Sequence, residues 1–406
     1  MPLSLYLSHG HQVELLQGSK ELFPALIEAM DRAQHDVRLE TYIFDFTGSG
    51  ASVAQALVRA AQRGVTTRLV VDGVGTGALP AEWQRRFDEA GVQWRVYSPL
   101  GPLGLLIPSG WRRLHRKLCV VDGEALFCGG INILDDFHDP NYGRLASPRF
   151  DFAVCAAGAL VEQAQDTMAQ LWWRMQAVSE VRHREFEAAL SSLRTVGAQF
   201  SHAHHARKEA AKRSRLARAG LLLRDNLRNR GRIEKAYRKA IGAARQEIII
   251  ANAYFVPGRK LRKALVLAAR RGVKVQLLLQ GRYEYFMQYH ASRPVYGALL
   301  AAGVEIYEYS PSFLHAKVAV IDGHWATVGS SNLDPLSLLL AREANVVVDD
   351  PDFAADLRGR LVRAMQEAGR RMDPAQYAQR PWRQRVLERI ALGLMRMALF
   401  VTGNRY

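Results

Sequence analysis

The chain has 406 residues with a formal net charge of +16, and 49% of its residues are hydrophobic. This length predicts about two or three domains, each able to bury a core, and the composition excludes a largely disordered protein. The three cysteines, Cys119, Cys128 and Cys155, are too few for a disulfide scaffold or most zinc modules, so we expect small buried hydrophobes. The basic excess indicates an anionic partner, which is nucleic acid, a phosphorylated substrate or an anionic lipid surface.

Residues 22–132 and 234–332 follow the same plan, element by element. Each copy has a helix-like opening, an apolar strand, a helix that ends in a glycine, a second apolar strand and a third helix that ends in a glycine. Strands that alternate with helices predict βαβ units. We therefore expect an α/β protein of two related domains, each a mostly parallel sheet flanked by helices. The two domains would pack against each other around a pseudo-two-fold axis.

The copies are separated and followed by segments of different character. We expect a first domain over 1–178, a basic inter-domain linker over 179–219, a second domain over 220–375 and an amphipathic C-terminal segment over 376–406. The linker holds His202, His204 and His205, whose irregular spacing favours a solvated basic surface over a metal site.

One motif stands at the same place in each copy: His-x-Lys-x4-Asp-x6-Gly-(Gly/Ser)-x-Asn. Its histidine and lysine are two residues apart, so on a strand they lie on the same face, while the apolar residues between them face the core. Glycines after the next strand allow the backbone to approach a ligand closely. The motif residues are His115, Lys117, Asp122, Asn132, and His315, Lys317, Asp322, Ser330, Asn332.

Such a pair of motifs suits attack on a phosphodiester. One imidazole would be the nucleophile and the other the general acid, since both have pKa values near neutral pH. The two lysines and two asparagines would donate to the equatorial oxygens, where charge develops in the transition state. Because the lysines neutralise this charge, we expect no metal and no cofactor.

These residues resemble the phospholipase D superfamily, whose members bring two such motifs to one active site. The segments IIIANAYFVPG, HWATVGSSN and SSNLDPLSLLLAREANVVV are similar to bacterial cardiolipin synthases of the B type, over roughly residues 11–350. The resemblance implies transfer of a phosphatidyl group from one phosphatidylglycerol to another, with release of glycerol through a phospho-histidine. It also implies a peripheral enzyme on the cytoplasmic side of the bacterial inner membrane.

By the same resemblance, the two His-Lys-Asp sets are catalytic, and either histidine can be the nucleophile. Glu343 matches the downstream acid that orients a histidine in this superfamily, and Asp151 is its counterpart in the first copy. Glu40 and Asn252 stand at matching ends of repeated strands and are expected to support the catalytic side chains or contact substrate. Arg342, just before the acid, departs from the family pattern.

Two segments favour contact with a membrane surface. Residues 98–111 are apolar and interrupted by three prolines, and they end four residues before His115. In 382–401, Arg385, Arg389 and Arg396 share one edge of a helix. The opposite side carries Val386, Ile390, Leu394, Met397 and Val401.

The sequence indicates no signal peptide, and no uncharged apolar run is long enough to span a bilayer. The alternative function is a hydrolase of the same superfamily, a phosphodiesterase acting on phospholipid or nucleic acid. The apolar segments favour anionic phospholipid, phosphatidylglycerol in particular, over nucleic acid as the partner. A membrane-binding protein without catalysis is disfavoured, because both motifs are intact.

Overall fold

The computed structural model describes residues 7–99, 112–182, 216–225, 229, 231–282, 286–334 and 341–401. The first half of the chain alternates strands and helices up to a central hairpin and a closing helix. Its elements are β1 (Ser8–Gln17), α1 (Gly18–Arg32), β2 (Asp36–Thr41), α2 (Gly48–Gln62), β3 (Thr66–Asp72), α3 (Ala81–Ala90), β4 (Gln93–Tyr97), β5 (Arg113–Leu114), β6 (Lys117–Val121), β7 (Ala125–Gly129), β8 (His138–Asp139), β9 (Gly143–Arg144), β10 (Phe152–Ala157) and α4 (Ala159–Arg182).

The second half repeats this order and adds a C-terminal extension. Its elements are β11 (Ala217–Arg224), α6 (Arg232–Ala243), β12 (Glu247–Asn252), α7 (Arg259–Arg270), β13 (Lys274–Gln280), α8 (Phe286–Leu300), β14 (Glu305–Tyr309), β15 (Lys317–Ile321), β16 (Trp325–Gly329), β17 (Ala341–Asp349), α10 (Pro351–Ala368), β18 (Gly369–Arg371), α11 (Pro374–Ala378) and α12 (Trp382–Val401). The predicted internal repeat is therefore present in the fold.

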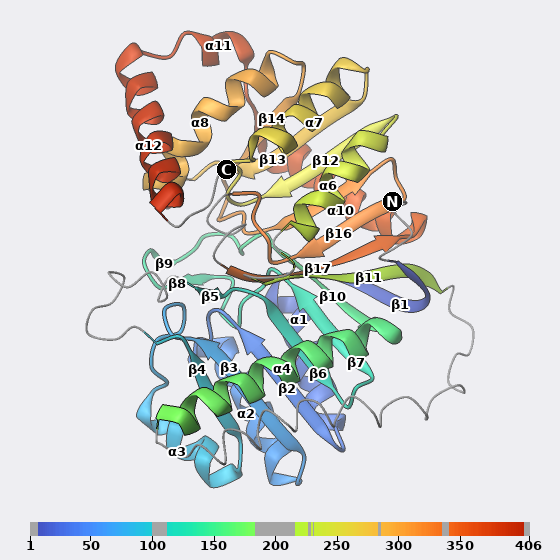
Figure 1. Ribbon diagram of the computed structural model, residues 1–406, viewed down its shortest axis with the longest axis vertical. Helices are drawn as coiled ribbons and strands as arrows, with labels where there is room; N and C mark the ends of the chain where they lie inside the picture. The colour runs from blue at the N-terminus through green and yellow to red at the C-terminus, as the bar shows by residue number, and fades with distance from the viewer. Residues whose placement is uncertain are drawn as a thin grey trace.

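The main sheet runs continuously from one half into the other (Figure 1). Its order is β18-β14-β13-β12-β15-β16-β17-β11-β1-β10-β7-β6-β2-β3-β4. Read outwards from the β1–β11 contact, the two halves have the same strand order. The strand order of the first half is thus repeated in the second half, running in the opposite direction along the sheet. This is the pseudo-two-fold relation that the sequence predicts.

The α/β class and the two related domains are confirmed, but each sheet is mixed rather than mostly parallel. On the main path of the sheet, β2-β3-β4 and β12-β13-β14 are parallel ladders, and the other described ladders there are antiparallel. The motif strands β6 and β7 are joined by a tight turn at Asp122 and Gly123, which reverses the chain and makes the pair antiparallel. β15 and β16 do the same in the second half.

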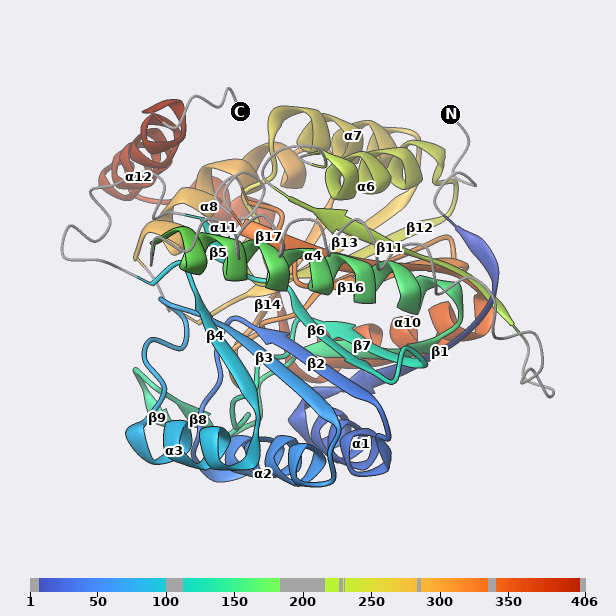
Figure 2. The same ribbon diagram turned by 60° about the horizontal axis from the view of Figure 1, so that its bottom comes forward.

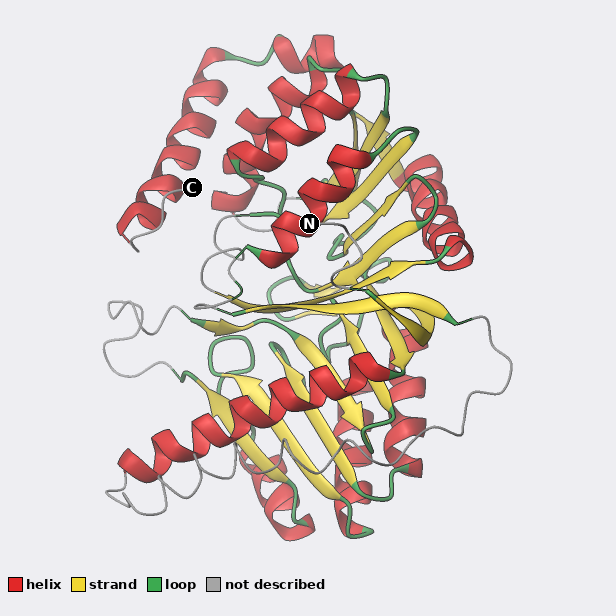
Figure 3. Ribbon diagram, turned by 45° about the vertical axis from the view of Figure 1, so that its right-hand side comes forward, coloured by secondary structure: helices red, strands yellow, loops and turns green. Residues whose placement is uncertain are grey.

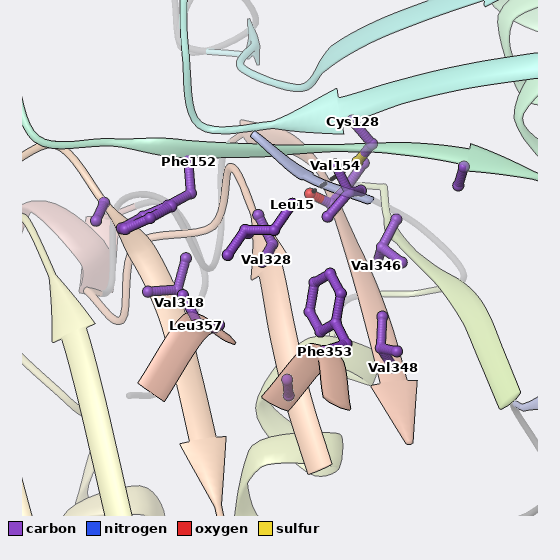
Figure 4. Close-up of a cluster of buried hydrophobic side chains, with 14 of the residues drawn as sticks. Leu15, Cys128, Phe152, Val154, Val318, Val328, Val346, Val348, Phe353 and Leu357 are labelled. Atoms are coloured by element: carbon purple, nitrogen blue, oxygen red, sulfur yellow. Dashed lines mark hydrogen bonds between the residues drawn. The ribbon is translucent and has the colours of Figure 1, made fainter. Parts of the chain in front are cut away.

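A hydrophobic core joins the two halves. Leu118 and Cys128 of the first half and Val318 and Val328 of the second belong to one buried cluster, which Figure 4 shows between strands of both halves. Each half also has its own core under its outer helices. Figures 2 and 3 show the resulting layers, with strands meeting at the middle of the molecule and helices outside them. The two motif hairpins are thus held against each other by apolar packing.

The boundary expectations need small corrections. The expected linker begins inside α4, which continues to Arg182, and it ends inside β11, which begins at Ala217. The three linker histidines and residues 100–111 lie outside the described residues. In the described part of the chain, Cys119 and Cys128 are buried free thiols and Cys155 is half-buried.

Candidate active site

The two motif histidines lie just before β6 and β15, and the motif lysines are the first residues of these strands. Lys117 and Lys317 are buried, and each ammonium donates to the carbonyl of the histidine two residues earlier, at 2.7 Å for Lys117. The histidine and the lysine of each motif are therefore close together, although each histidine lies just outside the strand on which the sequence predicts it.

Each histidine is paired with an acid from the other half of the chain. His115 Nδ1 lies 3.0 and 3.1 Å from the two carboxylate oxygens of Glu343, and His315 Nδ1 lies 2.6 Å from Asp151 Oδ2. Both acids are buried, with Glu343 fully shielded from solvent. Because Nδ1 is engaged in both rings, Nε2 is the nitrogen that each ring can present to a substrate.

The backbone repeats this crosswise arrangement. His115 N donates to Arg342 O at 3.1 Å, and His315 N donates to Phe150 O at 2.9 Å. The residue before each acid therefore holds the backbone of the histidine that the acid orients. This reciprocal exchange builds a single site from both halves.

Burial pushes the groups of the site towards their neutral forms. Burial, followed by the charge of Lys317, lowers the pKa of Lys117 to about 7, and burial raises the pKa of Asp151 to about 7. Burial also lowers the pKa of His115, where Glu343 opposes the shift. Burial and the charges of Lys317 and Lys117 lower the pKa of His315 well below its usual value. A neutral imidazole has the lone pair on Nε2 that a nucleophile needs. An incoming phosphodiester anion would favour the protonated forms of the lysines and of the second histidine.

Comparison with known proteins agrees with this geometry. A family model described as "Cardiolipin synthase, PLD-like domain" matches residues 26–145 and 237–365, which together hold both motifs. The chain belongs to this family. Cardiolipin synthase B of Escherichia coli (strain K12) is 35% identical over 382 residues, covering 92% of this chain and 85% of that protein. Cardiolipin synthase of Geobacillus thermodenitrificans (strain NG80-2) is 30% identical over 395 residues, covering 96% and 72%.

Among solved structures, phosphatidylserine synthase of Haemophilus influenzae Rd KW20 has the same fold, with a TM-score of 0.68. It is 13% identical in sequence, and the match covers 98% of this chain and 97% of that one. The two-domain phospholipase D-like fold is therefore shared over essentially the whole length of this cardiolipin synthase family member.

The two acids, Glu343 and Asp151, have different neighbours in the two halves of the chain. Ser330 Oγ donates to Glu343 at 2.5 Å, and it accepts from Ala344 N at 3.1 Å. The equivalent residue in the first half is Gly130, where an added Cβ would lie 2.4 Å from Asp151 Oδ1. Gly130 therefore leaves the space that Asp151 occupies beside His315.

We expect Gly130→Ala to displace Asp151 and to lower kcat about tenfold or more, because a misplaced orienting group weakens catalysis strongly. Steady-state transfer assays would measure this loss. Ser330→Ala is the matched change in the other half; it removes the hydrogen bonds of the hydroxyl to Glu343 and Ala344 without a clash, and its effect should be smaller. Equal activities of Gly130→Ala and the wild type would contradict this interpretation of the glycine.

The structure moves Asp122 and Asp322 out of the site. They lie beyond the far ends of β6 and β15 from the lysines. Asp122 accepts from the backbone N–H groups of residues 34–36 at 2.8–2.9 Å, and Asp322 accepts from those of 245–247 at 2.8–3.0 Å. Both have positive φ, 51° and 50°. The motif aspartates fix the start of β2 and β12, and they do not contact the catalytic histidines.

Substituting Asp322 by Ala should therefore cost stability rather than chemistry. Loss of a carboxylate that accepts three N–H bonds is expected to lower the free energy of unfolding by about 1–3 kcal/mol. Although burial opposes ionisation, the backbone donors lower the pKa of Asp322, so its contribution is present at neutral pH and lost as pH falls through that pKa. Urea unfolding at pH 7 and pH 3 would measure the loss of stability and its pH dependence. The kcat of the folded protein would measure any loss of catalysis. A large loss of kcat with unchanged stability would restore the catalytic role.

Glu40 and Asn252 do not occupy matching positions. The strand register places Glu40 opposite Leu118 and Asn252 opposite Lys317, so the counterpart of Asn252 is Thr41. Glu40 instead binds Arg116 through two hydrogen bonds of 2.5 and 3.0 Å, on the other face of the strand from Lys117. It is therefore a buried partner of Arg116, which precedes Lys117 in the chain.

The asparagines support the loops around the site. Asn132 Oδ1 accepts from Ile43 N at 3.2 Å, and Asn252 Oδ1 accepts from Leu333 N at 3.1 Å. Asn332 follows β16 and is buried. These contacts tie the ends of β2 and β12 to the ends of the motifs.

Three further residues position the first histidine and its counterpart. Asp72, at the end of β3, accepts from Leu114 N at 2.7 Å, and Gln280, at the end of β13, accepts from Leu314 N at 3.0 Å. The ring of Tyr42 lies 5.0 Å from that of His115. In the sequence, the one sign of Asp72 and Gln280 is that they stand at matching ends of the strands LVVD and LLLQ. The sequence carries no signal for Tyr42.

Proposed function

We propose that this protein is a cardiolipin synthase that transfers a phosphatidyl group between two phosphatidylglycerol molecules. The observation that carries the proposal is the crosswise pairing of each histidine with a buried acid from the other half, beside two buried lysines. It stands in a chain that is 35% identical to proteins named cardiolipin synthase B.

In the first step, Nε2 of one histidine attacks the phosphorus of the donor lipid. The bond to the headgroup glycerol breaks, and the other histidine donates the proton that this glycerol oxygen requires. Lys117 and Lys317 donate to the phosphoryl oxygens as charge develops. The products of this step are free glycerol and a phosphatidyl group bound to histidine.

In the second step, a hydroxyl of the second phosphatidylglycerol attacks this phosphorus. The histidine that had given up its proton now accepts one from the hydroxyl, and the bond between phosphorus and the nucleophilic histidine breaks. The acid partners keep both rings oriented through Nδ1. Two phosphatidylglycerols therefore give one cardiolipin and one glycerol, with both histidines restored.

The decisive experiment is to incubate purified protein with vesicles of labelled phosphatidylglycerol and to separate the products. Cardiolipin and glycerol in equal amounts are expected. Phosphatidic acid without cardiolipin would instead identify a hydrolase of the same superfamily. Cleavage of a nucleic acid in place of the lipid would assign a nuclease.

We further propose that the protein is peripheral on the cytoplasmic face of a bacterial inner membrane. Within the described residues, no helix is long and apolar enough to cross a bilayer. The helix α12 stands at the edge of the molecule beside α8 (Figures 1 and 2). Its inner side holds Glu388, bound by Arg380 at 2.6 and 2.8 Å, and Ala391, both buried.

The other side of α12 exposes apolar residues to solvent. Ile390 and Met397 are 53% and 59% exposed. Further exposed apolar residues of this helix are Trp382, Val386, Leu387 and Leu394. Arg385 and Arg389 are exposed beside them. An apolar stripe flanked by arginines favours insertion between the headgroups of an anionic leaflet.

Ile390→Asp should weaken binding to vesicles that contain phosphatidylglycerol by about tenfold or more, because it replaces about 1.5–3 kcal/mol of apolar burial with a charge. Sedimentation of protein with vesicles measures this binding. Leu267→Asp is the control, since Leu267 is 43% exposed but lies on α7. Equal loss in both variants, or none in either, would remove α12 from the membrane contact.

A further inference from the structure

A groove outside the catalytic centre lies between the edge strand β4 and the C-terminal turns of α4. It has a volume of about 380 Å³, and Arg68, Arg95, Trp94, Trp172, Trp173 and Gln176 line it. Figure 1 shows α4 crossing the face of the first-half sheet, with its C-terminal end beside β4. Arg68 is four residues before Asp72 on β3, so the groove is about 13 Å along the strand from the level of the active site.

The fold itself does not require arginines at this groove. The strand registers pair Arg68 with Gln93 and Gln276 with Glu305, which makes Gln276 the counterpart of Arg68. In the same way, Tyr307 is the counterpart of Arg95. One strand further in, Ile249 is the counterpart of Arg38. The second half builds the same sheet with one amide, one phenol and one apolar side chain, so the guanidinium groups are a specific feature of the first half.

Arg95 forms no salt bridge within the described part of the chain, and its Nη1 donates to Trp172 O at 3.1 Å. The charge of Glu180, which accepts from the groove residue Gln176 at 2.6 Å, acts on Arg95 at longer range. The guanidinium of Arg95 lies 4.0 Å from the centre of the Trp172 ring. Asp36 is shared by Arg38 at 2.5 Å and Arg68 at 3.5 Å, so these two arginines have one directly bonded carboxylate between them. Burial opposes the charged forms of Arg68 and Arg95 and lowers the pKa of both, and a bound anion would offset that cost.

The chemistry of the groove selects its ligand. Planar guanidinium groups that stack on tryptophan keep their N–H edge for oxygen acceptors and bind phosphate well. Trp173 adds an amphipathic ring, of the kind that favours the boundary between lipid headgroups and acyl chains. We propose that this groove binds the phosphate of an anionic phospholipid that is not the substrate being turned over. The proposal is independent of the transfer reaction proposed above.

The test uses the full chain and monomeric dihexanoyl phosphatidylglycerol, with a His115→Ala background so that no lipid is consumed. Equilibrium dialysis counts the bound lipid, and tryptophan fluorescence follows binding next to Trp172 and Trp173. We expect two classes of site, of which Arg95→Gln weakens one at least tenfold. Arg68→Gln should do the same, and it places in β3 the residue that β13 already carries. Arg174→Gln, an exposed change on α4, is the control and should alter neither class.

Three outcomes would overturn the proposal. The first is a single class of lipid site in the parent protein that Arg95→Gln does not weaken, because such a site would not be the groove. The second is equal binding by Arg95→Gln and the parent, or equal losses in Arg95→Gln and Arg174→Gln. The third is complete displacement of the groove lipid by inorganic phosphate at an equal concentration, which would assign a free-phosphate site instead. Thermal unfolding of each variant separates loss of binding from loss of fold.

Discussion

Replacing either motif histidine by alanine should lower phosphatidyl transfer by about 10³-fold or more, because one variant lacks the nucleophile and the other lacks the proton donor. The structure gives both rings the same environment in outline: Nδ1 on a buried carboxylate and a buried lysine two residues on. Initial rates on phosphatidylglycerol vesicles measure the loss. Retention of more than about a tenth of the wild-type rate by either variant would contradict the two-histidine mechanism.

The same variants identify the nucleophile. A substrate with a nitrophenolate leaving group needs no proton donor, so the variant that keeps the nucleophile should release one burst of nitrophenolate per chain. The variant that lacks the nucleophile should release none. Rapid-quench labelling with phosphate-labelled lipid gives an independent reading of the phospho-histidine. Bursts from both variants, or from neither, would exclude a single fixed nucleophile.

Asp151→Asn and Glu343→Gln should each lower kcat by about 10²–10⁴-fold while the fold is retained. A carboxylate accepts a hydrogen bond from Nδ1–H, so that Nε2 keeps its lone pair. An amide can instead donate a hydrogen bond to Nδ1, which favours the tautomer with the proton on Nε2. The short contact between Asp151 and His315, 2.6 Å, indicates that this pair is closely coupled. Steady-state kinetics measure the loss.

The chain offers a matched control for these changes. Asp349 also pairs with a histidine, His324 Nδ1, at 2.9 Å, but this pair is at the surface, where the histidine side chain is 56% exposed. Asp349→Asn should leave kcat within about twofold of the wild type, as surface substitutions usually do. If all three variants lost the same activity, the loss would reflect general damage rather than orientation of the catalytic rings.

The sequence alone determined the repeat, the fold class and the face on which the catalytic pairs lie. The period of two in a strand places His115 with Lys117 and His315 with Lys317 wherever the strand is packed. Similar order of elements in two segments predicts two similar domains, and the sheet order confirms it. These features are local, so they can be read from spacing and polarity alone.

The resemblance to the superfamily placed the motif aspartates with the catalytic groups, whereas the structure places them elsewhere. Four residues of strand separate the lysine from the aspartate, which carries Asp122 and Asp322 to the far ends of β6 and β15, where they bind backbone N–H groups. Alignment of strand ends likewise matched Glu40 with Asn252, although the register is one residue different. A one-residue change of register moves a side chain to the other face of a sheet, which is why Glu40 meets Arg116 instead of the site.

Only the tertiary structure decided which groups meet across the two halves. The pairs His115–Glu343 and His315–Asp151 join residues 228 and 164 positions apart, and no sequence spacing specifies such contacts. They form because apolar faces of both sheets are buried together, which brings the ends of β6 and β15 to one place. The groove beside β4 has the same origin, since α4 brings Trp172 onto Arg95 only after the helix packs across the sheet. Hydrophobic burial is non-directional, so the sequence can predict that these faces are covered, whereas the partner that covers them is set by the packing of the whole chain.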